Sequence, residues 1–374
     1  MTRNNLLLIV SFLILALGAL FLLHYFAYFS FVKFFQIKLA RTKLILFSSL
    51  VCLTLSFIAA SILSHYYENA LTRVFYFISS FWLGFGTTFV TFFVFVWVIY
   101  GFGKLIHLPL NLNLLGIIAL ILASIYSIYG VFNAQNVRIK NITVEIKNLP
   151  VEWQGKKVVQ ISDIHLGHIF RQKFFDKLAQ KVNSLEAEAV FITGDLFDGM
   201  GDGFGYLTPA LDSIKASKGT YFITGNHETY FGLDKAYDIL SKTKIKIFHD
   251  DMVVIDGLQI IGINHPENFV SKPVAEIIKK IPNYNADGPS ILLFHTPSQI
   301  KEIKQAGIKL MLSGHTHLGQ LFPYQLVAKA VYGDYDYGLN KIDDFTIYTS
   351  SGIGAWGPTM RTGTVSEIVV ITLK

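Results

Sequence analysis

Five apolar stretches in the second half of the chain each run directly into side chains that can bind metal ions. They are VVQIS before Asp163 and His165, AVFIT before Asp195 and Asp198, TYFIT before Asn226 and His227, ILLF before His295, and KLMLS before His315 and His317. Imidazole nitrogen suits Zn, Fe and Mn, and a carboxylate adds a hard anion that can bridge two cations. These are more donors than one tetrahedral ion can use. The residue types therefore predict a site for two metal ions.

Such a site requires the five stretches to be strands whose ends meet. In open α/β sheets, the carboxyl ends of parallel strands share one edge, and ligands bind there. Gly194, Gly225 and Gly314 stand at three of the strand ends, where glycine permits a tight turn and a close backbone approach. Two metal ions ~3.5–4 Å apart can hold the attacking and leaving oxygens of an in-line phosphoryl displacement.

The motifs D-x-H, G-D-x-x-D, G-N-H-[DE], a lone H and G-H-x-H occur in this order. Together they resemble the calcineurin-like metallophosphoesterase superfamily over roughly residues 140–374. The tail from Ser351 to Glu367 is also similar to a membrane-anchored bacterial subgroup. That subgroup commonly reads H-T-H-G-G-Q, and here Leu318 replaces the first of those glycines. The resemblance implies an α/β fold, a four-layer α/β/β/α sandwich of two sheets flanked by helices.

The resemblance also implies residue roles. The first metal ion would be held by Asp163, His165 and His317. The second would be held by Asn226, His295 and His315, and Asp195 would bridge the two. His227 would protonate the leaving oxygen, with Asp198 orienting its ring, while a metal-activated hydroxide attacks phosphorus. His168 and Arg361 are candidate substrate contacts, since a guanidinium binds phosphate through two hydrogen bonds. The cofactors would be two divalent ions, with Mn, Fe, Zn and Mg left open.

Each of these residues also has an ordinary structural interpretation when taken singly. An aspartate after a strand commonly caps a helix or stabilises a turn. A histidine at a strand end, such as His295, needs no ligand to explain it. The joint occurrence of all five motifs, each after an apolar stretch, favours the metal site.

Composition divides the chain into two halves. Of 374 residues, 52% are hydrophobic and 16% are charged, which is less charge than the roughly 25% of soluble domains. Residues 1–136 contain seven of the 32 basic residues and one of the 26 acidic residues, so residues 137–374 contain 25 of each. A neutral second half gives no electrostatic reason to expect a nucleic-acid partner or a nuclease. The single cysteine, Cys52, excludes an intrachain disulfide and a multi-cysteine metal site.

The first half contains four apolar runs, Leu6–Phe29, Leu44–Leu63, Val74–Phe102 and Leu114–Val131. Runs of about 20 apolar residues are long enough to cross a bilayer. The sequence thus predicts an all-α membrane domain with four transmembrane helices at 1–136, followed by a metallophosphoesterase domain at 137–374. Basic residues concentrate in the first connector, so the positive-inside rule places the catalytic domain outside the cytoplasm. The expected location is a bacterial inner or plasma membrane.

Alternating short strands and amphipathic helices are predicted after Val137. The strands are Thr143–Lys147, Lys157–Ser162, Ala189–Thr193, Gly219–Thr224, Met252–Asp256, Gln259–Gly262, Ile291–Phe294, Ile308–Leu312 and Thr346–Thr349. The helices are Phe174–Leu185, Leu233–Leu240 and Val274–Ile281, of which the first repeats apolar residues close to every 3.6 positions.

These features predict a membrane-anchored phosphoesterase of phosphomonoesters, phosphodiesters or pyrophosphates. The partners would be the bilayer and a phosphorylated small molecule or lipid. The alternative is a catalytically silent scaffold or sensor at the membrane, which is expected to have lost a ligand; none is missing here. No charged residue lies in the middle of an apolar run, which disfavours a transporter.

Overall fold

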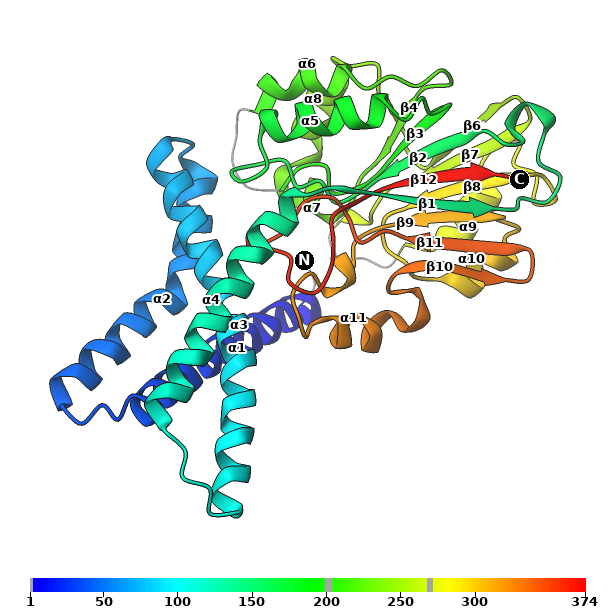
Figure 1. The fold of residues 1–374 in the computed structure, drawn as a ribbon. Helices are drawn as coiled ribbons and strands as arrows, with labels where there is room; N and C mark the ends of the chain where they lie inside the picture. The colour runs from blue at the N-terminus through cyan, green and yellow to red at the C-terminus, as the bar shows by residue number, and fades with distance from the viewer. Residues whose placement is uncertain (1–2, 199–203, 268–271) are drawn as a thin grey trace. The chain divides into compact units, whose positions relative to one another are not determined.

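The computed structural model describes residues 3–198, 204–267 and 272–374 (Figure 1). They form two compact units. The first comprises Met1–Phe132 and Gly357–Thr362, and the second comprises Asn133–Trp356 and Gly363–Lys374.

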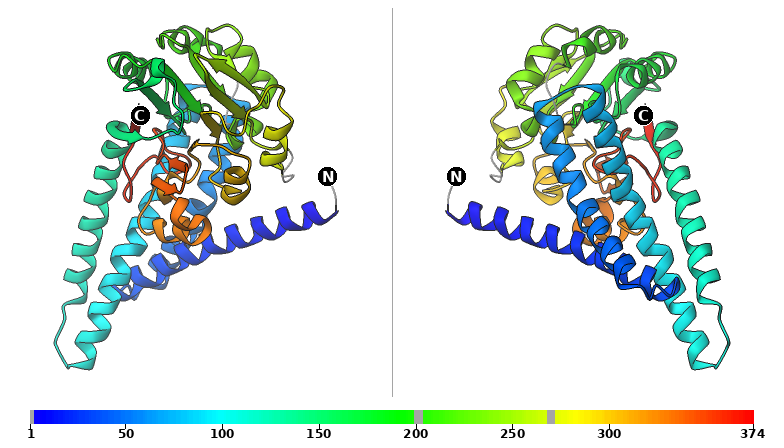
Figure 2. Two further views of the ribbon diagram at one scale, coloured as in Figure 1. Left: turned by 90° about the vertical axis from the view of Figure 1, so that its right-hand side faces the viewer. Right: turned by 90° about the vertical axis from the view of Figure 1, so that its left-hand side faces the viewer.

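The first unit contains the four predicted membrane helices. They are α1 (Arg3–Phe34), α2 (Ala40–Tyr66), α3 (Ala70–Leu105) and α4 (Leu112–Gln135), coloured from blue to cyan in Figure 2. All four contain stretches long and apolar enough to cross a membrane, and in α1 this stretch is Ile14–Phe34. The prediction of four such helices is confirmed.

Aromatic packing and a few polar contacts join these helices. The rings of Phe89 and Phe93 on α3 stack with centroids 4.1 Å apart, and the Phe31 ring of α1 stacks on Phe89 at 5.1 Å. The indole of Trp82 donates a hydrogen bond to the ring of His24, 2.9 Å away. Such a bond satisfies two polar groups inside an apolar bundle, where an unpaired one is costly. The His24 ring thus links α1 to α3.

Residues 357–362 come late in the sequence but belong to the first unit. Met360 fills the space over Gly84 of α3, where an added Cβ would lie 2.7 Å from the Met360 Cε atom. The backbone N–H of Arg361 donates to the carbonyl of Gly130 in α4, at 2.9 Å. The predicted division into domains 1–136 and 137–374 assigns residues 357–362 to the second domain, whereas they pack with the first unit. The position of these residues in the sequence does not indicate that the chain comes back to the membrane helices.

The second unit contains two six-stranded sheets. The first sheet has the order β1 (Arg138–Val144), β12 (Glu367–Leu373), β2 (Lys157–Ile161), β3 (Ala189–Thr193), β4 (Thr220–Ile223) and β5 (Lys246–Ile247). The second has the order β10 (Gly338–Ile342), β11 (Phe345–Thr349), β9 (Leu310–Ser313), β8 (Ser290–Phe294), β7 (Leu258–Ile263) and β6 (Asp251–Ile255). Strands β2, β3 and β4 are parallel, as are β7, β8 and β9.

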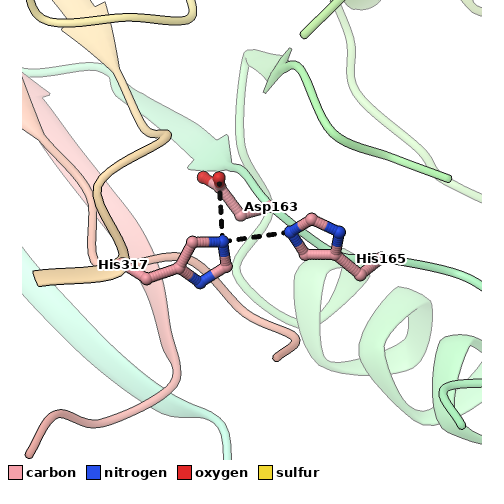
Figure 3. Close-up of side chains that lie close together, drawn as sticks. All are labelled: Asp163, His165 and His317. Atoms are coloured by element: carbon pink, nitrogen blue, oxygen red, sulfur yellow. Dashed lines mark hydrogen bonds and ion pairs between the residues drawn. The ribbon is translucent and has the colours of Figure 1, made fainter. Parts of the chain in front are cut away.

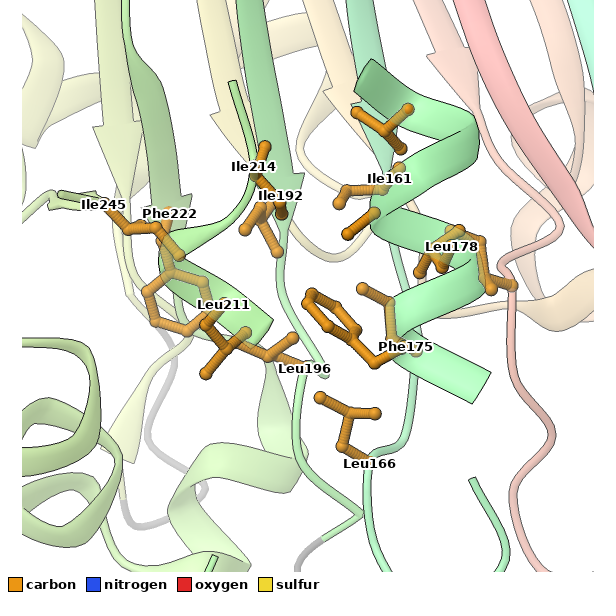
Figure 4. Close-up of a cluster of buried hydrophobic side chains, with 14 of the residues drawn as sticks. Ile161, Leu166, Phe175, Leu178, Ile192, Leu196, Leu211, Ile214, Phe222 and Ile245 are labelled. Atoms are coloured by element: carbon orange, nitrogen blue, oxygen red, sulfur yellow. The ribbon is translucent and has the colours of Figure 1, made fainter. Parts of the chain in front are cut away.

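The two sheets and the helices outside them form four layers around three apolar cores. Val190 and Ile192 of β3 face α5 (Gln172–Asn183), α6 (Thr208–Asp212) and α8 (Leu233–Leu240), in the core drawn in Figure 4. Ala189 and Phe191 of the same strand point the opposite way, into the core between the sheets. A third core lies under α9 (Val274–Lys280) and α10 (Ile300–Gln305). Alternate side chains of a strand face opposite sides, so a strand buried on both faces needs the continuous apolar stretches seen in the sequence.

Several elements differ from those predicted. The first strand covers Arg138–Val144 rather than Thr143–Lys147, because it pairs along its whole length with β12, which was not predicted. Strands β5 and β10 were not predicted, nor were the short helices α6, α7 (Asn226–Phe231), α10 and α11 (Gln325–Tyr332). Helices of one or two turns show too little periodicity to be recognised from spacing, and they depend on tertiary packing. The predicted four-layer α/β/β/α sandwich is confirmed.

Candidate metal centre

The two sheets bring the predicted donors together at the carboxyl ends of five strands. Ile161, Ile192 and Phe222 are register partners on β2, β3 and β4, so these strands end side by side. Leu293 and Leu312 are partners on β8 and β9. The first sheet supplies Asp163, His165, Asp195, Asn226 and His227, and the second supplies His295, His315 and His317.

One group of donors consists of Asp163, His165 and His317 (Figure 3). The Nε2 atom of His317 lies 3.0 Å from Nε2 of His165 and 3.3 Å from a carboxylate oxygen of Asp163. One donor atom from each of the three residues lies within 4.8 Å of the other two. Asp163 also accepts a hydrogen bond from the backbone N–H of His315, at 2.9 Å.

A second group consists of Asp195, His295 and His315, again within 4.8 Å of one another. The Asp195 Oδ2 atom lies 3.1 Å from Nε2 of His295 and 4.0 Å from Nε2 of His165. Asp195 therefore lies between the two groups. The amide oxygen of Asn226 is buried and has no hydrogen-bond partner. A buried oxygen of this kind needs a compensating partner, and a cation among mixed nitrogen and oxygen donors meets that need. The residues present thus fit divalent metal ions.

His227 lies beside these donors at the start of α7. Its ring is 4.5 Å from the His165 ring, centroid to centroid, and it forms a third donor group with His165 and Asp195. The Nδ1 atom lies 2.7 Å from the backbone carbonyl oxygen of Asp198, which can accept only if Nδ1 carries the proton. The Asp198 carboxylate instead lies 3.5 Å from Nδ1 of His165. Asp198 therefore contacts His227 through its main chain.

The backbone around the donors is unusual. Five of the seven predicted ligands have positive φ angles, namely Asp163 (52°), His165 (52°), Asp195 (50°), His315 (72°) and His317 (48°). Such conformations cost about 1–3 kcal/mol each for residues other than glycine, and they cluster at functional sites. Leu318 also has a positive φ, of 47°. The membrane-anchored subgroup that the sequence resembles has glycine at this position, and glycine adopts a positive φ without steric cost.

Two glycines leave room for the carboxylates. A Cβ atom on Gly225 would lie 2.2 Å from Oδ1 of Asp195, and one on Gly314 would lie 2.1 Å from Oδ2 of Asp163. Both distances are far shorter than a non-bonded contact allows. Any larger residue at either position would displace a predicted ligand, which explains why each strand end has glycine there.

Glu228 is a functional residue whose role the sequence did not reveal. It is fully buried, and its carboxylate accepts hydrogen bonds from the backbone N–H groups of Asp195, Phe197 and Gly225, at 3.0, 3.0 and 2.7 Å. These bonds tie the end of β3 to the end of β4. Burial and the nearby Asp195 carboxylate raise the pKa of Glu228 to about 7, although the bonds from Phe197 and Gly225 oppose that rise. Glu228 thus positions the loop that carries the central aspartate.

The electrostatics of the site centre on Asp195. Burial alone would raise its pKa, but the imidazoles of His295, His227 and His165 hold that pKa well below its usual range. Burial likewise disfavours a charged His295, but the adjoining Asp195 carboxylate raises the pKa of His295 to about 10. For His315, burial and the neighbouring His295 lower the pKa to about 3. The Asp195 carboxylate thus stabilises a positive charge on the adjacent His295. A metal ion that binds to a histidine displaces the proton from the nitrogen that it binds.

His265 is a second residue that the motifs did not reveal. Its ring centroid lies 6.1 Å from that of His295 and 6.4 Å from that of His315. The signal was present in the sequence, because His265 follows the end of β7, a parallel neighbour of β8. Its burial lowers the pKa to about 4, an effect that His295 reinforces.

The two candidate substrate contacts lie outside the donor groups of the described residues. His168 is buried in the turn that follows His165. Arg361 is fully buried and belongs to the first unit, within residues 357–362. A contact between either side chain and substrate stays a prediction.

The chain is similar to known proteins over most of its length. The sequence model of the family described as calcineurin-like phosphoesterase matches residues 156–319. An uncharacterized metallophosphoesterase of Campylobacter jejuni is 34% identical over 270 residues, covering 71% of each chain. A Helicobacter pylori metallophosphoesterase, also uncharacterized, is 32% identical, covering 63% of this chain and 64% of the relative. A transmembrane protein with metallophosphoesterase domain from Danio rerio is 30% identical, covering 69% of this chain and 62% of the relative.

These similarities agree with the convergence of aspartate, asparagine and histidine side chains at the strand ends. The family uses a dinuclear divalent metal centre, and the four apolar helices together with transmembrane relatives indicate a membrane protein. The chain belongs to the calcineurin-like phosphoesterase family of metal-dependent phosphoester hydrolases.

Proposed function

We propose that the strand-end donors hold two divalent ions and that the chain hydrolyses a phosphoester carried by a membrane lipid. The ligands would be Asp163, His165 and His317 for one ion and Asn226, His295 and His315 for the other, with Asp195 between them. The observation that supports this most is the convergence of donors from five strands of two sheets, in groups whose atoms lie within 4.8 Å of one another.

Bound divalent ions would lower the pKa of a water molecule and neutralise charge on the phosphoryl oxygens. The protein's own residues then have distinct tasks. Asp195 holds the two donor groups together. His227 donates a proton to the leaving oxygen: the Asp198 carbonyl is bonded to its Nδ1 atom, so Nε2 is the nitrogen that remains for this transfer.

Two half-exposed aromatic rings flank His227. Its ring centroid lies 5.2 Å from that of Tyr230 and 5.5 Å from that of Trp356, which are 46% and 51% exposed. The proton donor therefore faces an apolar and accessible surface. A leaving group with an apolar portion would be desolvated there, which favours a lipid or other amphipathic alcohol over a strongly hydrated one.

The metal dependence provides a direct test. Purified full-length protein is expected to contain about two divalent ions per chain, because the donor set divides into two groups around Asp195. Removing them with a chelator should abolish hydrolysis of bis(4-nitrophenyl) phosphate, and adding Mn²⁺, Zn²⁺ or Mg²⁺ back one at a time should restore it. Elemental analysis and the hydrolysis rate measure the two quantities. Full activity of metal-free protein would refute the proposal, and a metal-loaded but inactive protein would favour the silent scaffold.

We also propose that the catalytic domain lies outside the cytoplasm, since basic residues concentrate in the connector between α1 and α2. In a Cys52→Ser background, Lys173→Cys on α5 should react with a membrane-impermeant maleimide in intact cells. Lys38→Cys in the first connector is the matched control and should react only after lysis; both lysines are exposed. The reverse pattern would place the catalytic domain in the cytoplasm.

A further inference from the structure

The second unit has an exposed apolar surface that its fold does not explain. Five large apolar side chains there are solvent-exposed, and we call them the apolar ridge: Phe322 (41%), Tyr324 (42%), Leu326 (73%), Val327 (56%) and Val331 (66%). They lie within ten residues and make up five of the eleven large apolar side chains that are exposed among the described residues of this unit. Single exposed apolar residues are ordinary, but a concentration of them marks a binding surface.

Helix α11, labelled in Figure 1, carries three of the five ridge residues, namely Leu326, Val327 and Val331. Successive residues of a helix are about 100° apart. Leu326, Ala330, Val327 and Val331 therefore span a continuous arc of about 140°. The opposite face holds Ala328, which is buried, and Tyr332, whose ring contacts that of His315. A helix of a soluble domain turns its apolar arc inward, whereas this one presents it outward.

The ridge adjoins the candidate metal centre. The ring centroid of Tyr332 lies 6.0 Å from that of the predicted ligand His315. Gln320, two residues before Phe322, hydrogen-bonds the backbone N–H and carbonyl of Trp356 at 2.9 and 3.1 Å. Trp356 in turn contacts the ring of His227. The same short segment thus joins the exposed apolar surface to residues around the reacting centre.

A lipid bilayer is the partner that fits this surface. Helix α4 ends at Gln135 and β1 begins at Arg138, so the chain between them can span at most about 11 Å. This short connection keeps the start of β1 close to the end of a predicted membrane helix. Residues 321–333 contain no aspartate or glutamate, and their one lysine, Lys329, pairs with Asp334 at 2.7 Å, so no uncompensated negative charge of this segment opposes its approach to lipid headgroups. Exposed aromatic rings such as those of Phe322 and Tyr324 are common where protein meets lipid headgroups. A second protein copy would need about 20–30 residues on each side, far more than these five.

We propose that the apolar ridge inserts into the interfacial layer of the bilayer and so holds the metal centre beside the phosphoester groups of lipids. This inference rests on the proposed function for its account of the substrate. The insertion itself is a separate physical claim, since a helix with an outward apolar face gains free energy by burying that face in lipid whatever reaction follows.

Fluorescence quenching tests the insertion without reference to activity. Full-length protein with Cys52→Ser and Leu326→Cys is labelled with an environment-sensitive fluorophore and reconstituted into vesicles of phosphatidylcholine and phosphatidylglycerol. Nitroxide-labelled lipids should quench this fluorophore severalfold more than one at Lys301→Cys, an exposed position on α10. Equal quenching at the two positions would overturn the proposal. So would a disulfide-linked dimer through Leu326→Cys, which would show a second copy at the ridge.

A charge-introducing variant tests the link to the substrate. Leu326→Asp with Val331→Asp should lower hydrolysis of vesicle-borne phosphatidic acid at least about fivefold, while its water-soluble dibutanoyl counterpart stays within twofold. Leu326→Met with Val331→Ile keeps the apolar arc and should match the unaltered protein. Equal losses on both substrates would contradict a lipid-specific role. Strong quenching in a protein that hydrolyses neither compound would leave the insertion standing and count against the proposed function.

Discussion

The His227→Ala protein is expected to retain both metal ions and to lose roughly 10²–10⁴ in kcat, the usual contribution of a positioned general acid. The reason is geometric. The Nδ1 atom of His227 is bonded to the Asp198 carbonyl oxygen, and its buried ring contacts both the donor His165 and the half-exposed rings of Tyr230 and Trp356. Removing the ring therefore deprives the leaving oxygen of its proton source.

The identity of the leaving group makes this test sharper. An alkyl phosphodiester, whose leaving alkoxide is strongly basic, should show the full loss, and a 4-nitrophenyl ester should show much less, because its leaving group departs without a proton. His249→Ala, on an exposed loop beside Tyr237, is the matched control and should behave as the unaltered protein. Loss of a metal ion from His227→Ala would show that His227 is a ligand, as its proximity to His165 and Asp195 also allows.

Asp195→Asn should be at least as damaging. The change preserves the shape of the side chain, so the hydrogen bond from the backbone N–H of His227 to Oδ1, 2.8 Å long, can persist. It removes the negative charge that lies between the two donor groups, 3.1 Å from His295 and 4.0 Å from His165. Losing even a residue that supports a ligand costs 10–100-fold in affinity or activity, so loss of the shared carboxylate should cost at least about 100-fold.

Metal titration followed by calorimetry, together with the rate of phosphodiester hydrolysis, measures the effect of Asp195→Asn. Asp287→Asn, an exposed aspartate in the same unit, provides the control for the change of charge. Normal affinity for two ions in Asp195→Asn would contradict a bridging role. A protein that binds no metal and has also lost its folded state would be recognised by its circular dichroism, and Asp195→Glu would then report on the site with the charge retained.

Much of the metal centre follows from local sequence. The stretches before Asp163, Asp195 and His295 are mostly apolar, because these strands are buried along nearly their whole length, and the donors stand just after them. Glycine also precedes Asp195, Asn226 and His315 in the sequence, although the reason at Gly225 and Gly314 is a tertiary one, because a side chain there would collide with the carboxylate of Asp195 or Asp163. Patterns of this kind are visible without coordinates.

Other parts of the centre depend on contacts between distant segments. Glu228 belongs to a recognised motif, but its role arises from hydrogen bonds to the backbone of Asp195 and Phe197, more than thirty residues earlier. His265 approaches His295 only because β7 pairs with β8. Strand β12 lies between β1 and β2 although it is last in sequence. The pairing of distant strands and loops behind these relations leaves no periodic or spacing signal, although the position of His265 just after a strand is visible in the sequence.

The sequence by itself determined the chemistry: which donor types are present, that each follows a buried strand, and that four apolar helices precede them. Those properties are local, because the type of a side chain, the apolar pattern of a buried strand and the length of a membrane helix each depend on consecutive residues. The tertiary structure decided the rest, namely that two sheets contribute to one centre, that residues 357–362 pack with the membrane helices, and that α11 turns its apolar arc outward. These depend on which distant surfaces bury one another, a choice made by the free energy of the whole fold.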